Sequence, residues 1–261
     1  MPEFIVAAGH RLETACLYAE RDDWPWLVFL HEGLGSIAQW RDFPQRLCAA
    51  ADCRGLLYSR CGYGNSEVLG GPRAPDYLHQ EALQTLPEVL QRFGIEQPFL
   101  LGHSDGASIA LIYAAQHASA VAATIVLAPH VLVEPISIAG IEAAREAYLR
   151  TDLRARLARY HADPDSAFLG WNNIWLQPAF RNWNIEALLA AIRCPLLAIQ
   201  GEQDQYGTML QLQRIAAGAT GSAVELCKLA RCGHAPHTEQ PEIVLAAVQA
   251  FIARVARRQA G

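Results

Sequence analysis

Long apolar runs, paired cysteine motifs and low-complexity tracts are all missing from this sequence of 261 residues. No apolar run approaches the ~20 residues that a membrane-spanning helix needs, so we expect no transmembrane segment and no membrane partner. No Cys-x-x-Cys pair occurs, and the seven cysteines are an odd number, which argues against a zinc or redox motif and against a disulfide framework. The sequence therefore indicates no metal and no other cofactor.

A large excess of one charge is also missing, since only 18% of the residues are charged and the net charge is −5. The chain lacks the strong net positive charge that is typical of nucleic-acid-binding proteins, so we expect no nucleic-acid partner. The basic cluster at Arg254, Arg257 and Arg258 is typical of a helix end, where cations interact favourably with the helix dipole. The start of the chain, Met1–Glu3, lacks a basic region and a long apolar core, so we expect no signal peptide and a cytoplasmic protein.

An alternation of strand and helix patterns occupies most of the chain. Two short strand-like runs, Phe4–Ala7 and Leu12–Ala19, flank a Gly9-His10 turn and predict an antiparallel hairpin. Five helical patterns are present: residues 37–50, residues 79–93, the segment directly after Ser104, residues 208–217, and the end of the chain from Pro241. Ser36 would cap the first of them. Buried-strand patterns lie between them, at Trp24–Leu30, Arg54–Tyr58, Phe99–Leu101, Val121–Leu127, Pro195–Gln200 and Val224–Leu229. This order favours a mostly parallel sheet with helices on both faces.

The alternation stops between residues 136 and 190. A helical pattern covers Ile141–Tyr160, a loop is expected at Ala162–Asp165, and a tryptophan-rich segment follows over 171–183. This stretch has no strand pattern and indicates a helical insertion of about fifty residues. We therefore expect a core made of residues 1–135 and 191–261, with residues 136–190 inserted into it; the family resemblance described below implies that this insertion is a cap.

Residues 102–106 read Gly-His-Ser-Asp-Gly, directly after an apolar run and directly before a helical pattern of small residues. Bending a strand into a helix within a few residues brings two backbones together, and Gly102 and Gly106 have no Cβ to obstruct that approach. Such a turn holds the hydroxyl of Ser104 clear of the sheet, near a helix N-terminus that favours developing negative charge. We interpret Ser104 as a nucleophile.

A serine hydroxyl is a weak nucleophile until a base removes its proton, so Ser104 needs a histidine and an acid. On a sheet of this kind, the acid and then the histidine follow the serine in the chain. His234 is the later histidine that lies in a glycine-flanked loop after a late strand, and Asp204 follows the strand at 195–200. Sites on open parallel sheets form at the carboxyl ends of the strands, so the three side chains can meet there.

Two other residues compete for roles in this site. Glu134, just past the strand at 121–127, is the alternative acid, because some folds of this kind carry the carboxylate there. His237 lies three residues beyond His234 and would suggest a metal pair, but no cysteine or carboxylate spacing supports one. We predict no metal site.

Acyl transfer passes through a tetrahedral oxyanion, which needs two backbone N–H donors in a dry pocket. The amide of Asp105, directly after the serine, is expected to be one donor. The other is expected from Gly33 or Leu34, in the glycine-rich loop that follows the strand at 24–30. A plain strand-to-helix loop remains the alternative reading of that segment.

These motifs resemble the α/β-hydrolase family over nearly the whole chain, most closely the small bacterial members with a helical cap. Such members include enol-lactonases, meta-cleavage-product C–C hydrolases and carboxylesterases. The resemblance implies an α/β-hydrolase fold with an eight-stranded, mostly parallel sheet, a helical cap and a triad of Ser104, Asp204 and His234. The matching segments are 31–33, 59–66, 102–106, 201–204 and 233–236, followed by Glu239 and Pro241.

The chain departs from the family pattern at two places. Glu32 stands where the family generally has glycine, and its carboxylate would oppose a second negative charge unless it turns away or pairs, with Arg60 as a candidate partner. The loop at 59–66 opens with Ser59 rather than aspartate and has Cys61 where arginine or proline is usual. That loop is generally structural, so no chemistry is assigned to it.

Aromatic residues are expected above the triad, where they suit an apolar acyl or aromatic group. The candidates are Trp171, Trp175 and Trp183 of the inserted segment and Tyr206 after the acid. For Trp171 and Trp183, a structural role that holds the cap together or attaches it to the core is slightly favoured. His103 and His130, beside the strand ends, complete the candidate substrate-binding residues. No arginine or lysine lies in an obvious position to bind a carboxylate, although Arg60, Arg145 and Arg181 are conceivable.

The sequence thus favours a serine hydrolase that cleaves a carboxylic ester or related acyl bond of a small apolar substrate through an acyl-enzyme. A C–C bond hydrolase acting on a meta-cleavage product, or an enol-lactonase, is the first alternative. A non-catalytic ligand-binding module on the same fold is the second. The expected partner is a small ester, lactone or dienoate-type molecule, and a homodimer is left open.

Overall fold

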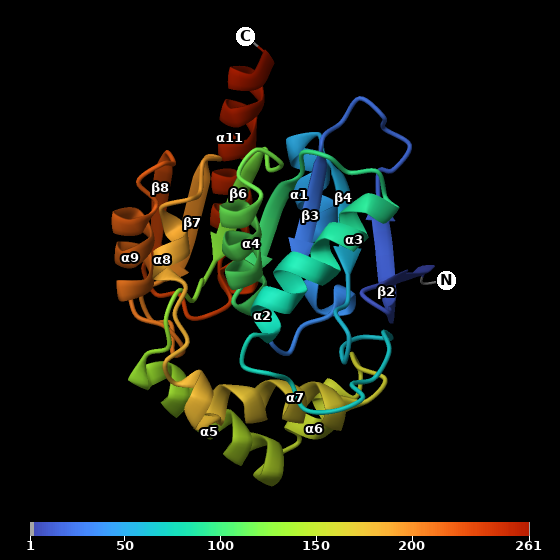
Figure 1. Cartoon of the computed structure of the whole chain (residues 1–261), viewed down its shortest axis with the longest axis vertical. Helices are drawn as coiled ribbons and strands as arrows, with labels where there is room; N and C mark the ends of the chain where they lie inside the picture. The colour runs from blue at the N-terminus through green and yellow to red at the C-terminus, as the bar shows by residue number, and fades with distance from the viewer. Residues whose placement is uncertain (1–2, 261) are drawn as a thin grey trace.

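The computed structural model describes residues 3–260, with the side chains up to residue 258, and is built on one eight-stranded sheet (Figure 1). The order of strands across the sheet is β1-β2-β4-β3-β5-β6-β7-β8. The hairpin of β1 and β2 is antiparallel, β2 pairs antiparallel with β4, and the remaining neighbours are parallel. The strands are β1 Glu3–Ala7, β2 His10–Leu17, β3 Trp26–Leu30, β4 Arg54–Tyr58, β5 Phe99–His103, β6 Ala123–Leu127, β7 Leu196–Gly201 and β8 Val224–Leu229.

Successive residues of the central strands pack on opposite faces of the sheet, because side chains alternate along a strand. In β3, Leu27 and Phe29 belong to one apolar core, whereas Val28 and Leu30 belong to the other. Burial on both faces explains why these strands are continuous apolar runs in the sequence. The predicted α/β-hydrolase fold, with its mostly parallel sheet of eight strands and helices on both faces, is confirmed.

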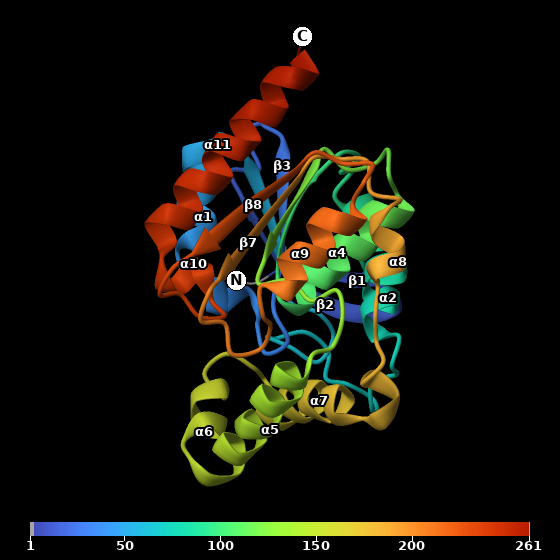
Figure 2. The same cartoon turned by 90° about the vertical axis from the view of Figure 1, so that its left-hand side faces the viewer.

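Figure 2 shows the two helical layers on either side of the sheet. One layer holds α1 (Phe43–Ala51), α10 (Pro236–Glu239) and α11 (Pro241–Ala260). The other holds the helix after Ser104, α4 (Asp105–Gln116), with α2 (Tyr77–Gln80), α3 (Leu86–Arg92), α8 (Glu186–Leu189) and α9 (Leu210–Gly218). None of the helices described within residues 3–260 is long and apolar enough to cross a lipid bilayer.

Helices α5 (Pro135–Arg150), α6 (Leu153–Leu157) and α7 (Pro164–Leu176) lie together below the sheet in Figures 1 and 2. They come from the segment between β6 and β7, and α5 packs against both α6 and α7. A short 3-10 helix, η3 (Pro178–Phe180), follows α7, and the chain then returns to α8, which packs against α4 and α9. We refer to α5, α6 and α7 as the cap helices; the predicted division at residues 136 and 190 stays a prediction.

Several predicted helix limits are wrong for local reasons. The segment predicted as one helix over 37–50 is a 3-10 helix, η1 (Ile37–Trp40), followed by α1, because Arg41 between them has a left-handed φ of 54°. Ser36 makes no capping hydrogen bond there. The helix predicted over 79–93 begins at Tyr77 and contains a π-helical segment, η2 (Glu81–Thr85). Pro87 lies just after it and lacks the N–H that a regular turn would use.

The cap contains two more differences from the sequence prediction. The helix predicted over 141–160 begins at Pro135 and ends at Arg150, where Thr151 is extended. Its true start carries a capping box, in which Glu134 and Ser137 satisfy each other's backbone N–H groups. The loop predicted at 162–165 ends sooner, because α7 begins at Pro164: Ala162 and Asp163 lie outside the helix, and Asp163 caps it by accepting a hydrogen bond from the amide of Ser166.

Candidate active site

Ser104 occupies the sharp turn between β5 and α4. Its backbone has a φ of 52° and a ψ of −114°, a conformation that L-residues rarely adopt. The turn needs both neighbouring glycines: a Cβ on Gly102 would lie 2.2 Å from the carbonyl oxygen of Gly106. A Cβ on Gly106 would lie 2.0 Å from the carbonyl oxygen of Leu30. The amide of Ser104 donates to the carbonyl of Leu127, which ties the turn to β6.

The structure brings Ser104, His234 and Asp204 into one hydrogen-bonded line. Nε2 of His234 lies 2.9 Å from Oγ of Ser104. On the other side of the ring, Nδ1 of His234 lies 2.8 Å and 2.9 Å from the two carboxylate oxygens of Asp204. The three residues come from the ends of three strands, β5, β7 and β8, although 130 positions separate the serine from the histidine.

The carboxylate of Asp204 is buried and held in the ionised form. Burial opposes ionisation, but the hydrogen bond and the charge of His234 outweigh it, so the pKa of Asp204 lies below its ordinary value. The amide of Tyr206 donates to Oδ1 at 2.8 Å, and the side-chain amide of Gln200 approaches Oδ2 at 3.3 Å. Asp204 is thus oriented from both sides to accept the Nδ1–H of the histidine.

Glu134, the alternative acid, has a different environment. Its two oxygens accept from the amide of Thr208 at 2.8 Å and from the Thr208 hydroxyl at 2.6 Å. Nε2 of Gln211 donates to the same carboxylate at 3.1 Å. Glu134 therefore links α5 to the start of α9 and does not contact His234.

The amide of Asp105 is the first of α4, so it has no partner within the helix and is free to bind an anion. The loop after β3 supplies a second amide through the peptide between Glu32 and Gly33. The carbonyl of Glu32 accepts hydrogen bonds from Nδ1 of His31 at 2.7 Å, from Arg60 at 2.9 Å and from the amide of Gly35 at 3.1 Å. Because a trans peptide is planar, the N–H of Gly33 points opposite to that carbonyl, away from these donors.

Glu32 pairs with His103, and the suggested pairing of its carboxylate with Arg60 is wrong. Oε2 of Glu32 lies 3.4 Å from Nδ1 of His103, while Nε2 of the same ring lies 2.7 Å from the backbone carbonyl of His234. Arg60 instead lies beneath the loop, with its guanidinium on backbone carbonyls and 3.6 Å from the carboxylate of Asp105. The carboxylate next to the amide donors therefore faces His103 rather than Arg60.

A cavity of about 100 Å³ lies directly over Ser104, between the strand ends and the cap helices. Four of the predicted substrate-binding residues line it, whereas His103 lies behind His234 and not in the lining. Ser137 and Ile141 of α5 also line the cavity, and the sequence does not single them out. Ser137 belongs to the part of α5 that precedes the predicted start. The residues around the cavity are Glu32, Gly33, Leu34, Ser104, His130, Ser137, Ile141, Trp171, Trp175, Tyr206 and His234.

The polar groups in this lining are neutral or paired. Burial, together with the nearby His234, lowers the pKa of His130 to about 3, so its imidazole is uncharged at neutral pH. Nε1 of Trp175 donates to the hydroxyl of Tyr77 at 3.1 Å, and that hydroxyl donates to Asp105 at 2.7 Å. The indole of Trp171 packs on Gly33 so closely that a Cβ there would lie 2.1 Å from Nε1.

His237 is buried against the rings of Trp40 and Phe43, and burial lowers its pKa to about 3. Within residues 3–260, no group of three or more histidine, cysteine, aspartate or glutamate side chains is arranged to hold a metal ion.

Comparison with known proteins gives relatives of similar architecture. A 2-succinyl-6-hydroxy-2,4-cyclohexadiene-1-carboxylate synthase from Enterobacter sp. (strain 638) is 27% identical over 201 residues, which cover 76% of this chain and 69% of that protein. The enol-lactonase from Burkholderia xenovorans LB400 superimposes with a TM-score of 0.74 at 20% identity, over 96% of this chain and 100% of that one. A thermophilic esterase from Thermogutta terrifontis gives a TM-score of 0.76 at 16% identity, over 98% and 99% of the two chains.

The two structural likenesses describe the fold, since their sequence identities are low. The family is identified by a match over residues 27–247 to the sequence model of the alpha/beta hydrolase family. That range runs from β3 to α11 and includes the turn at Ser104 and the residues Asp204 and His234. This chain belongs to the α/β-hydrolase family.

Proposed function

We propose that this protein is a serine hydrolase that cleaves a small, uncharged carboxylic ester or a related acyl bond through an acyl-enzyme. The observation that carries the proposal is the line of hydrogen bonds from Ser104 through His234 to Asp204, with distances of 2.9 Å and 2.8 Å. A hydroxyl, an imidazole and an ionised carboxylate in that order form the arrangement that activates serine as a nucleophile.

In the proposed reaction, Oγ of Ser104 attacks the carbonyl carbon of the ester while Nε2 of His234 takes the hydroxyl proton. The electron pair of the carbonyl moves onto its oxygen, which the amides of Asp105 and Gly33 bind. The C–O bond to the alcohol then breaks, and His234 returns the proton to the departing oxygen. Asp204 stabilises the imidazolium in both steps. Water, activated by His234, then hydrolyses the acyl-enzyme and releases the acid.

The lining of the cavity supports an uncharged substrate. None of the described residues around the cavity is an arginine or a lysine. The three arginines considered from the sequence are engaged elsewhere: Arg145 binds Asn172 and Asn173, Arg181 lines surface hollows, and Arg60 lies beneath the loop. A carboxylate brought into this small space would lose its water without gaining a cationic partner, which is costly.

The same argument weighs against the alternative substrates. A ring-cleavage dienoate carries a carboxylate, and so does the compound in the name of the Enterobacter relative. The solved neighbours include an esterase as well as an enol-lactonase, and the apolar, cation-free lining suits an uncharged ester or lactone better than a substrate that carries a carboxylate. A purely ligand-binding role is disfavoured because it would not require Asp204 to be oriented on His234.

The test compares the unmodified chain with Ser104→Ala on p-nitrophenyl acetate and butyrate. We expect loss of essentially all turnover, and we expect a fluorophosphonate to label Ser104, as located by mass spectrometry of the digested protein. Ser222→Ala is the control, because Ser222 bonds to the carbonyl of Cys194 outside the site. Full activity of Ser104→Ala on these esters would contradict the proposal.

A further inference from the structure

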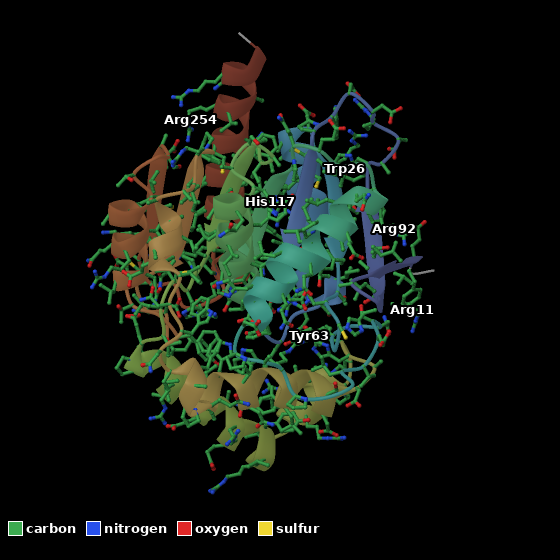
Figure 3. The ribbon with its side chains drawn as sticks, viewed as in Figure 1. Arg11, Trp26, Tyr63, Arg92, His117 and Arg254 are labelled. Atoms are coloured by element: carbon green, nitrogen blue, oxygen red, sulfur yellow. The ribbon has the colours of Figure 1, made fainter. Side chains whose placement is uncertain are left out.

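Arg60 is a buried arginine beneath the candidate active site, with 1% of its surface exposed. It follows β4, and its guanidinium lies over the ring of Tyr63, 4.9 Å from the ring centroid. Figure 3 labels Tyr63 at the level where the sheet meets the cap helices. Burying a guanidinium is expensive unless its contacts compensate, so the contacts of Arg60 indicate its purpose.

The guanidinium contacts the two segments that carry the amide donors. Nη2 of Arg60 donates to the carbonyl oxygen of Glu32 at 2.9 Å and approaches that of His31 at 3.3 Å. Nη1 lies 3.6 Å from Oδ2 of Asp105, which is fully buried. The hydroxyl of Tyr77 donates to the same oxygen at 2.7 Å and holds the carboxylate from the other side.

The contact with Glu32 fixes the direction of an N–H group, and the contact with Asp105 holds the side chain of the residue that carries the other N–H group. The carbonyl of Glu32 and the N–H of Gly33 belong to one rigid peptide, so a donor that holds the carbonyl also sets where the N–H points. The carboxylate of Asp105 belongs to the residue whose own amide begins α4. One side chain therefore connects both halves of the anion-binding arrangement, which come from loops 72 positions apart, at residues 33 and 105.

We propose that Arg60 is a positioning residue that aligns the amides of Gly33 and Asp105 on the oxyanion. The inference rests on the proposed serine hydrolase function and adds to it a residue that does not touch the substrate. Arg60 acts with Asp105 as a pair, so the alignment depends on both side chains. Sequence motifs would not identify this role, because Arg60 lies in a loop read as structural.

A matched second pair separates alignment from simple stabilisation. Arg73 is buried like Arg60 and lies over the same Tyr63 ring, with its Cζ atom 4.9 Å from the ring centroid. It pairs with the buried Glu81 at 3.8 Å and donates to the carbonyl of Cys61. Arg73 thus shares the burial and the ion pair of Arg60, but it does not contact the loop of Gly33.

The experiment compares two double variants in the full chain, Arg60→Met/Asp105→Asn and Arg73→Met/Glu81→Gln. Removing both charges of a pair leaves no buried charge without a partner, so both proteins are expected to fold. The readouts are kcat and KM on p-nitrophenyl butyrate, the affinity for an alkyl boronic acid, which forms a tetrahedral adduct with an active serine, and Tm.

For Arg60→Met/Asp105→Asn we expect kcat and boronic acid affinity to fall together by about 10- to 100-fold, with KM changed by less than about 3-fold. For Arg73→Met/Glu81→Gln we expect a lower Tm with kcat within about 3-fold of the unmodified chain. Equal losses of kcat in both pairs, or an unchanged kcat in the first, would overturn the role of Arg60. If the unmodified chain is not labelled by a fluorophosphonate and Ser104→Ala keeps its activity, the serine hydrolase function fails and the role of Arg60 fails with it.

Discussion

The ring of His103 joins the loop of Glu32 to the loop that carries His234. Its Nε2 lies 2.7 Å from the backbone carbonyl of His234, and its Nδ1 lies 3.4 Å from the carboxylate of Glu32. Both partners are acceptors, so the protonated ring, which has a hydrogen on each nitrogen, is the form that fits this site. Burial lowers the pKa of His103, but the hydrogen bond and charge of Glu32 outweigh it and raise the pKa above its ordinary value.

This buried pair predicts a pH-dependent contribution to stability. Because the folded-state pKa of His103 is raised, the pair stabilises the fold fully below the ordinary histidine value of about 6.5. The contribution is lost as the pH rises through the higher folded-state value. We expect Glu32→Gln to lower Tm most at about pH 6 and less at about pH 9. Thermal unfolding across this range measures the effect.

The exposed pair of His10 and Glu67 is the control for this prediction. Solvent screens it, so Glu67→Gln should change Tm little at either pH. A Tm difference between Glu32→Gln and the unmodified chain that stays constant from pH 6 to pH 9 would show that His103 is not a buried cation.

The two candidate acids predict opposite results when each carboxylate becomes an amide. Asp204→Asn should lower kcat by about 10⁴-fold, since an amide cannot stabilise the imidazolium and favours the wrong tautomer of His234. Glu134→Gln should lower Tm, because Thr208 loses a charge-assisted bond, and should leave kcat within about 3-fold. Steady-state kinetics and thermal unfolding of both variants distinguish between the two candidate acids. The assignment of the acid is reversed if Glu134→Gln is the inactive one.

The turn at Ser104 predicts an unusual sensitivity to a single methyl group. Gly102→Ala and Gly106→Ala each place a Cβ within 2.2 Å of backbone oxygen, and backbone atoms have little room to move. We expect each variant to lose more than about 3 kcal/mol of stability or to fail to fold. Gly70→Ala is the control, because a Cβ there meets no heavy atom within 4 Å. Urea unfolding of the three variants measures the difference.

The size of the cavity predicts selection by acyl chain length. Trp171 forms part of the lining over Ser104, so Trp171→Ala should admit longer chains and raise the ratio of kcat/KM for octanoate over butyrate by at least about 10-fold. Trp183→Ala is the control, because Trp183 stacks on Phe180 outside the lining. A series of p-nitrophenyl esters gives the ratio. An unchanged ratio in Trp171→Ala would mean that this wall does not limit the acyl group.

The residues of the site that the sequence predicts are those that a local sequence pattern requires. Gly102 and Gly106 reveal the turn because close backbone approach demands glycine at fixed spacing. Asp204 and His234 are found because they follow apolar strands, and the ends of parallel strands meet at one edge. The same reasoning predicts the strands themselves, since burial on both faces produces continuous apolar runs.

The parts that sequence reasoning missed depend on contacts between distant loops. Glu32 and His103 lie 71 positions apart, and no periodicity marks them as partners. The sequence suggests Arg60 as a partner for the carboxylate of Glu32, but Arg60 contacts the backbone carbonyl of that residue instead. The place of Glu134 after β6 suggests it as the acid, whereas its local role as the cap of α5 determines its position.

The hydrogen bond from Trp175 to Tyr77 gives the cap helices a mechanical part in the site. Tyr77 donates to Asp105, so a displacement of α7 that breaks the bond from Trp175 leaves the hydroxyl that holds this carboxylate with one partner fewer. Any movement of α7 away from the sheet would therefore also weaken the support of the Asp105 carboxylate. Holding α7 against the sheet should therefore limit the reorientation of Asp105 and its amide. Displacing α7 should increase that reorientation, although α7 does not carry Ser104.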